Sequence, residues 1–163
     1  PFVGGVDVGL YSEILNDTIS QLNLREAITV PPSLPIREVV TQLRGRSLGC
    51  VIVIDPEQRP LGIFTEAVLR KLVCDHRDGL DEPVERHMEP DVPLAKMTDP
   101  VAVVLEAMRK HDHRFVCIVN EEGQVSALTG QKGLMEYVAE RFPNKLLTQP
   151  VRTHLPQAQR EGA

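Results

Sequence analysis

Gly49-Cys50-Val51-Ile52-Val53-Ile54-Asp55 is the stretch of this sequence that decides the fold. Its short apolar run, bounded by a glycine and an acidic turn, predicts a buried β-strand. A polar turn over residues 56–60 follows, and then a second apolar run that ends at Thr65. When the sequence is shifted along itself by 65 positions, residues 114–120 fall on this stretch, and another strand pattern ends at Thr129. Such a duplication governs the interpretation of the whole chain.

The helix predicted before the strand is repeated as well. Four apolar residues at helical spacing recur 65 positions later: Ile36, Val39, Val40 and Leu43 reappear as Val101, Val104, Leu105 and Met108. Strand patterns at residues 27–30 and 92–95 precede these two helices, and further helices are predicted from Thr65 and after Thr129. Each copy therefore predicts a β-α-β-β-α unit. We expect the two units to pack about a pseudo-twofold axis and to leave two related clefts between them.

This pattern divides the chain into five parts. They are an N-terminal arm with a lead-in helix (1–24), the first repeat (25–75), a linker with a second lead-in helix (76–88), the second repeat (89–142) and a C-terminal tail (143–163). Residues 1–10 are glycine-rich and predict a loose arm. Ser12 is the expected cap of the first lead-in helix, which would run to about Leu24 and pack against the second repeat.

Composition limits the classes of protein to which the chain can belong. The 163 residues are 42% hydrophobic and 25% charged, and a net charge of −5 disfavours direct nucleic-acid binding, which usually needs a basic face. The apolar runs are far shorter than the roughly 20 residues of a membrane-spanning helix, and no signal-peptide pattern is visible. Cys50, Cys74 and Cys117 have no metal-ligand spacing, so we expect reduced thiols in a cytoplasmic protein. The start at Pro1 is compatible with a fragment of a longer protein.

From about Ile19 to Phe142, the pattern resembles the tandem CBS-domain pair, or Bateman module, a family named after cystathionine β-synthase. The resemblance rests on the strand that ends at Asp55, the turn after it, and Gly62-Ile63-Phe64-Thr65 at the start of a helix, repeated at the family's domain length. It implies an α/β fold of two pseudo-symmetric CBS repeats packed as a single module. It also implies a regulatory protein without catalysis of its own, which binds AMP, ADP, ATP or S-adenosylmethionine in its clefts. Such a protein relays occupancy to a regulated enzyme or transporter, and we expect a homodimer.

Five polar residues are candidates for binding the phosphates of a ligand: Thr65, His113, Arg114, Thr129 and Lys132. A threonine between a strand and a helix presents a hydroxyl beside free backbone N–H groups at the positive end of the helix dipole. His113-Arg114 resembles the pair that contacts nucleotide phosphates in the gamma subunit of AMP-activated protein kinase, and arginine offers a fixed fork of donors to phosphate oxygens. Three alternatives stay open: the threonines only cap helices, the basic pair offsets a helix C-terminus, and Lys132 is simply exposed.

The resemblance also implies an adenine and ribose pocket at seven positions, namely Ile28, Thr29, Leu48, Cys50 and Val68 in the first copy and Leu94 and Phe115 in the second. Taken alone, the apolar residues among them are core residues. In the family, an aspartate three residues after the threonine commonly holds the ribose, because a carboxylate accepts hydrogen bonds from both hydroxyls. Here Val68 and Lys132 stand at those positions, so the chain departs from the family's ribose site in both copies.

Two other functions remain open at this point. A pair that has lost its ligand would serve as a dimerisation or protein-interaction module, and the missing aspartates favour this alternative. An enzyme is disfavoured, because the sequence has no nucleophile elbow, metal-ligand run or Walker loop. If only one cleft is occupied, the basic residues of the second copy predict that the phosphate end of the site is built there.

Overall fold

The computed structural model describes residues 2–3, 6–46, 48–75 and 78–141. At the N-terminus, β1 (Phe2–Val3) pairs antiparallel with β2 (Val6–Asp7), and α1 (Val8–Asn16) follows directly. The prediction of a loose arm followed by a helix from Ser12 to about residue 24 is wrong in its bounds, because the helix begins at Val8 and ends at Asn16. A short 3₁₀ helix, η1 (Ile19–Gln21), forms the lead-in to the first repeat. The predicted C-terminal tail lies outside the described residues.

The first repeat contains a three-stranded sheet in the order β3–β4–β5. The parallel pair is β3 (Thr29–Val30) and β4 (Cys50–Ile54), and α2 (Ile36–Arg46) connects these two strands. β5 (Pro60–Thr65) runs antiparallel to β4, and α3 (Glu66–Asp75) follows it. The first four residues of β4 are fully buried, as a continuous apolar run predicts for a strand covered on both faces.

The second repeat has the same plan. Two 3₁₀ helices, η2 (Gly79–Asp81) and η3 (Val84–Arg86), lead from α3 into it. β6 (Leu94–Lys96) runs parallel to β7 (Phe115–Val119), α4 (Val101–His111) connects them, and β8 (Val125–Gly130) runs antiparallel to β7. α5 (Gln131–Arg141) ends the described part of the chain. The predicted α/β fold of two β-α-β-β-α repeats is confirmed.

Backbone irregularities recur at the 65-residue offset. A bulge interrupts the central antiparallel pair at Val53/Ile54 in the first repeat and at Ile118/Val119 in the second. The hairpin turns place Gln58 (φ 66°) and Gly123 (φ 78°) in the left-handed region at equivalent positions. The duplication therefore extends to the details of strand pairing, beyond the apolar pattern from which it was predicted.

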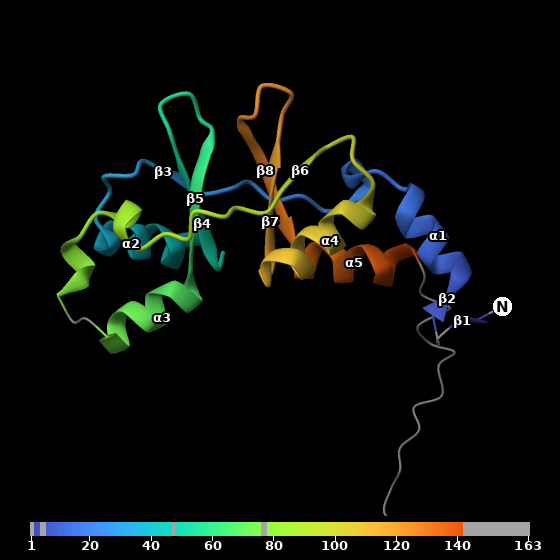
Figure 1. Cartoon of the computed structure of the whole chain (residues 1–163), viewed down its shortest axis with the longest axis horizontal. Helices are drawn as coiled ribbons and strands as arrows, with labels where there is room; N and C mark the ends of the chain where they lie inside the picture. The colour runs from blue at the N-terminus through green and yellow to red at the C-terminus, as the bar shows by residue number, and fades with distance from the viewer. Residues whose placement is uncertain (1, 4–5, 47, 76–77, 142–163) are drawn as a thin grey trace, which may run out of the picture.

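The lead-in segments exchange partners between the repeats. Ile19 of η1 is fully buried in the apolar core of the second repeat, and Val84 of η3 is fully buried in the core of the first. Figure 1 shows the segments before β3 and β6 crossing from one half of the molecule to the other. Cys117 and Leu128 of the second repeat also belong to the first repeat's core. The expected packing of the first lead-in against the second repeat is confirmed, and the two repeats form one folding unit.

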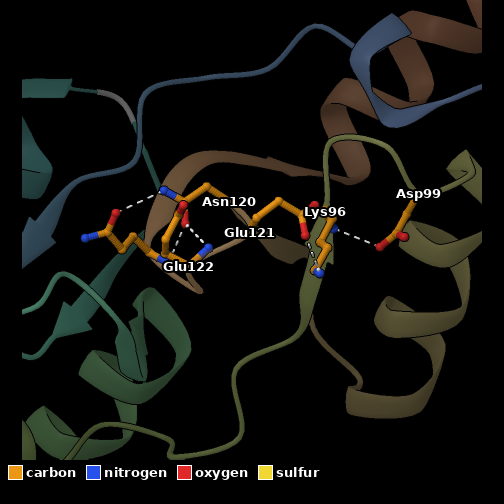
Figure 2. Close-up of polar contacts among 6 residues, drawn as sticks. Lys96, Asp99, Asn120, Glu121 and Glu122 are labelled. Atoms are coloured by element: carbon orange, nitrogen blue, oxygen red, sulfur yellow. Dashed lines mark hydrogen bonds and ion pairs between the residues drawn. The ribbon is translucent and has the colours of Figure 1, made fainter.

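The two hairpins lie side by side at the top of Figure 1, and their turns are bonded to each other. The N–H of Val125 donates to the carbonyl of Gln58 at 2.9 Å, and the Gln124 amide donates to the carbonyl of Glu57 at 3.0 Å. Figure 2 shows how the second turn is closed: the Asn120 side chain accepts the backbone N–H of Glu122 at 3.0 Å. In the same view, Lys96 donates to the Glu121 carboxylate at 3.1 Å. The two bonds between the turns join the hairpins of the two repeats, whereas the Asn120 and Lys96 contacts hold the second turn within its own repeat.

Candidate functional site

The helix starts after β5 and β8 lie at the clefts, and strand pairing defines which residues are equivalent there. Thr65 pairs with Cys50 in the first repeat, and the corresponding pair in the second repeat is Gly130 with Phe115. The sequence match between Thr65 and Thr129 is therefore wrong by one residue, because Thr129 occupies the strand position that corresponds to Phe64. Because both residues are threonines, they were matched in the sequence although their positions in the strand register differ by one residue.

The two threonines consequently have different surroundings. The Thr65 hydroxyl accepts the N–H of Val68 at 3.3 Å and so caps α3. Thr129 is 5% exposed, and its hydroxyl is buried without a hydrogen-bond partner among the described residues. It packs against the first turn of α5, where a Cβ at Gly133 would lie 2.8 Å from the hydroxyl oxygen. Gly133 also takes the place equivalent to Val68, so neither repeat has a carboxylate three residues into the helix start.

A first cleft of about 200 Å³ lies at the start of α3, between the two repeats. Its lining residues come from the first repeat and from the loop between α4 and β7; they are Gly49, Thr65, Glu66, Ala67, Arg70, Asp112, His113, Arg114 and Phe115. Asp112 has φ 52°, and this left-handed residue ends α4 and turns the chain toward β7. The cleft therefore contains both basic and acidic side chains.

A second cleft of about 460 Å³ lies at the start of α5. It is lined by Arg25, Leu48, Gly49, Arg114, Phe115, Gln131, Lys132 and Met135. An adjoining recess of about 50 Å³ shares most of these residues and adds Asn23, Leu128, Thr129, Gly130 and Gly133. The charged residues that line the second cleft are all basic, and Leu48, Phe115 and Met135 add apolar side chains to its lining.

Arg114 is the predicted phosphate ligand that lies at both clefts and at the recess. Its backbone is fixed, because its carbonyl accepts the N–H of Gln131 at 2.9 Å and a Cβ at Gly130 would collide with the same carbonyl. Its side chain is exposed and, among the residues that the structure describes, has no ion-pair or hydrogen-bond partner. The guanidinium is thus available to an anion from either side.

The other predicted phosphate ligands are divided between the clefts. Thr65 and His113 line the first cleft, whereas Thr129 and Lys132 belong to the second cleft and its recess. The His113 ring is 13% exposed, and its Nε2 lies 2.7 Å from the Glu89 carboxylate. His111 is held in the same way, with Nδ1 2.7 Å from the carboxylate of Asp91. The structure therefore brings Arg114 together with Lys132, and engages His113 with Glu89.

The predicted adenine and ribose positions are scattered. Leu48 and Phe115 line the second cleft, as expected for apolar walls. Ile28 and Cys50 are buried in the core, Val68 is half-buried on α3, and Leu94 is 45% exposed on β6; these four do not line either cleft. Thr29 lines a separate cavity of about 350 Å³ at the far end of β3 and β4.

Four charged cleft residues were not among the sequence candidates: Arg25, Glu66, Arg70 and Asp112. Glu66 and Arg70 lie in the first turns of the helix predicted after Thr65. Their place near that helix start is the feature of the sequence that could have identified them as cleft residues. No local sequence pattern identifies Arg25 as a cleft residue, because its position depends on an isolated backbone bridge to Leu128 in the other repeat. Pairing between distant segments of this kind is not visible in local sequence patterns.

The three cysteines are free thiols. Burial raises the pKa of both Cys50 and Cys117 to about 12, and for Cys50 the neighbouring Cys117 adds to this effect. Both thiols are therefore protonated at neutral pH and inert, as the expectation of buried reduced cysteines requires. Cys74 is exposed at the end of α3.

Neither a metal site nor a membrane-spanning helix is present among the described residues, which are 2–3, 6–46, 48–75 and 78–141. No group of three or more His, Cys, Asp or Glu side chains is arranged to hold a metal ion there. In the same part of the chain, none of the helices combines the length and apolarity needed to cross a membrane.

Comparison with known proteins identifies the family. The CBS domain model matches the chain twice, at residues 19–75 and 84–140, so the chain belongs to the CBS-domain family. An uncharacterised 17.7 kDa protein of Acidianus ambivalens is 28% identical over 116 residues, which cover 71% of this chain and 70% of that protein.

Solved structures agree with this assignment. A CBS domain protein from Pyrobaculum aerophilum, solved in complex with AMP, is 26% identical, with a TM-score of 0.65 and coverage of 76% of this chain and 99% of that one. The CBS domain pair of protein MJ0100, solved with 5′-methylthioadenosine and S-adenosyl-L-methionine, has a TM-score of 0.69 at 18% identity. It covers 77% of this chain and 98% of that one, and at this identity it supports the fold alone. The resemblance found in the sequence is confirmed.

Proposed function

We propose that the chain is a regulatory module that senses an adenine nucleotide or a related adenosyl ligand, and that Arg114 binds the anionic group of this ligand. The observation that carries the proposal is the position of Arg114, whose exposed guanidinium lies at both clefts without a partner among the described residues. An arginine fork matches the geometry of a phosphate or carboxylate and binds it through charge-assisted hydrogen bonds. The AMP complex of the Pyrobaculum relative supports the ligand class.

The surroundings of Arg114 suit such a ligand. Leu48 and Phe115 supply an apolar wall in the second cleft, and Lys132 at the start of α5 adds a second cation there. Thr65 lies across the first cleft, at the start of α3. Occupancy of a cleft would change the contacts between the two repeats, because each cleft is lined by both. This is how the proposed module would pass the signal to a regulated enzyme or transporter.

Isothermal titration calorimetry tests the proposal with AMP, ADP, ATP, S-adenosylmethionine and 5′-methylthioadenosine as ligands. We expect saturable binding of at least one anionic member of this set, and a matching rise in the thermal midpoint, because a ligand that binds only the folded state stabilises it. Arg114→Ala should weaken that binding at least tenfold.

The control is Arg109→Ala, which removes another exposed arginine, one that pairs with Glu106 on the surface of α4. We expect its ligand affinity to equal that of the wild type. Absence of binding to all five ligands at millimolar concentration would refute the proposal, and so would equal losses in the two variants.

A dimerisation module is the second candidate function, favoured by exposed apolar residues on the two helices that follow β5 and β8. Val73 of α3 is 50% exposed and Met135 of α5 is 65% exposed. Light scattering measures the mass of the wild type, of Val73→Asp and of a control, Leu61→Asp, at the β4–β5 hairpin. A dimer that only Val73→Asp dissociates supports this function, whereas a monomeric wild type excludes it.

A further inference from the structure

The segments that precede β3 and β6 each form a backbone bridge to the other repeat, and the two bridging residues, Arg25 and Glu89, carry opposite charges. Arg25 bonds to Leu128 of β8 in both directions, at 2.9 and 2.8 Å, and Glu89 bonds to Ile63 of β5 in both directions, at 2.8 Å. The two bridges are related by the pseudo-twofold axis, because Leu128 and Ile63 are equivalent strand residues. An arginine thus stands beside the second cleft where a glutamate stands beside the first.

Because of this difference, the two clefts have different net charges. At the first cleft, Glu89 holds His113, and the two arginines of the lining, Arg70 and Arg114, are offset by Glu66 and Asp112. The second cleft is lined by Arg25, Arg114 and Lys132, and no carboxylate is among its lining residues. The first cleft is therefore close to electrically balanced, whereas the second has an excess of positive charge.

The cations of the second cleft are only weakly neutralised by the protein. Arg25 has one ion-pair partner among the described residues, Glu136 on α5, at 3.9 Å. Both side chains are more than a third exposed, and exposed pairs of this kind contribute little. Lys132, like Arg114, has no such partner among the described residues. Three cations at one cleft repel one another, and a ligand with several negative charges relieves this repulsion better than one with a single charged group.

The start of α5 favours the same kind of ligand. This helix has 11 residues, and the N–H of Gln131 is already engaged by the carbonyl of Arg114 at 2.9 Å. The next N–H groups, those of Lys132 and Gly133, belong to the first turn of α5 and contribute to the positive end of its helix dipole. Thr129, whose buried hydroxyl has no hydrogen-bond partner among the described residues, also lines the adjoining recess.

Building on the proposed function, we propose that the second cleft is a polyphosphate site and that Arg25 is the residue that determines this specificity. Arg25, Arg114 and Lys132 together contact the di- or triphosphate of an adenine nucleotide. The module would then discriminate ADP and ATP from AMP by charge, and the first cleft would not contribute to this selectivity.

Calorimetry with AMP, ADP and ATP under identical salt and metal-free conditions tests the proposal. We expect ATP to bind about tenfold or more tightly than AMP, a difference of about 1.4 kcal/mol. Arg25→Glu, which gives the second cleft the residue type found at the first, should abolish this difference by weakening ATP binding more than AMP binding. Glu136→Gln should increase ATP affinity, because it frees Arg25.

The control is Arg37→Glu, a charge reversal at an exposed arginine of α2 that is paired with Asp81, away from both clefts. If Arg25→Glu does not fold, Arg25→Gln takes its place, with circular dichroism to verify the fold. Equal affinities of AMP and ATP, or an unchanged ATP preference in the folded Arg25 variant, would overturn the polyphosphate site while leaving the proposed function intact. If no nucleotide binds, the proposed function fails. The affinities of inorganic tripolyphosphate and of phosphate are then compared to test the cleft alone. Tighter binding of tripolyphosphate that requires Arg25 supports the polyphosphate site, and absence of such binding refutes it.

Discussion

In the first repeat, β5 ends at Thr65, whose hydroxyl caps the following helix. In the second, β8 ends at Gly130, and Thr129, one residue earlier, is buried with no hydrogen-bond partner for its hydroxyl in the described part of the chain. The backbones around these residues are nevertheless equivalent, since the bulge and the turn residue with positive φ of the first repeat recur 65 residues later in the second. Strand pairing and turns have thus been kept in both repeats, whereas the side chains at the helix starts have diverged.

The position of these side chains explains why they are free to differ. Glu66 and Lys132 lie at the beginnings of helices, and Arg25 lies in the segment before β3, so all three are outside the two apolar cores. Changes there alter the charge of a cleft and cost little packing energy. A duplicated fold therefore allows its two clefts to acquire different ligands while the shared core holds the repeats together.

The largest expected effect concerns the close approach at Gly130. A Cβ there would collide with the backbone carbonyl of Arg114, which has no freedom to rotate away as a side chain would. Gly130→Ala should therefore lower the free energy of unfolding by about 3 kcal/mol, the upper part of the range for overpacking. Urea unfolding, followed by circular dichroism, measures this change.

Gly45→Ala is the matched control for this substitution. Gly45 lies in the last turn of α2, and a Cβ there would meet no atom within 4 Å. We expect it to stabilise the protein by up to about 1 kcal/mol, because alanine is the better helix former. If Gly130→Ala were as stable as the wild type, the close contact between β8 and the Arg114 loop would not exist in solution.

The fold could be predicted from the sequence because the 65-residue repeat places apolar residues in register over a helix and a strand. The bounds of α1 could not be predicted from the sequence. The glycine-rich start predicts a loose arm, whereas the strands Phe2–Val3 and Val6–Asp7 form a small antiparallel pair that leads directly into the helix. The equivalence of the threonines was also misjudged. The strand register shows that Thr129 stands one position before Gly130, the counterpart of Thr65, and the 65-residue shift of the sequence places Gly130 there as well.

The candidate site was predictable in part for a similar reason. Arg114 and Lys132 lie in local patterns, a loop before a strand and the first turn of a helix, and the structure brings both to the second cleft. Arg25 reaches the same cleft through a bridge between the two repeats, and Glu89 reaches His113 through the equivalent bridge. Contacts of this kind between the lead-in segments and the other repeat depend on how the lead-ins cross, which local periodicity does not encode.

The two threonines give a prediction of intermediate size. Thr65→Val removes the hydroxyl that caps α3 and should destabilise the protein by about 1 kcal/mol. Thr129→Val removes a buried hydroxyl that has no partner among the described residues, and should stabilise the protein by about 1 kcal/mol, because an unpaired buried polar group is unfavourable. Chemical unfolding of both variants measures the opposite signs. Equal destabilisation by the two substitutions would show that the hydroxyls have the same role, contrary to the strand register.

The smallest expected effect compares the two hairpin turns, where Gln58 occupies the left-handed conformation that Gly123 occupies in the second repeat. A residue with a Cβ is strained at φ 66°, and glycine is not. Gln58→Gly should therefore stabilise the protein by roughly 0.5 kcal/mol, the strain relieved being partly offset by the greater entropy of the unfolded chain. Gln42→Gly, at an exposed position within α2, is the control and should cost about 1 kcal/mol. Both are measured as shifts of the urea midpoint at a constant slope, and a loss of stability in Gln58→Gly would show that the glutamine side chain, rather than the backbone conformation, supports this turn.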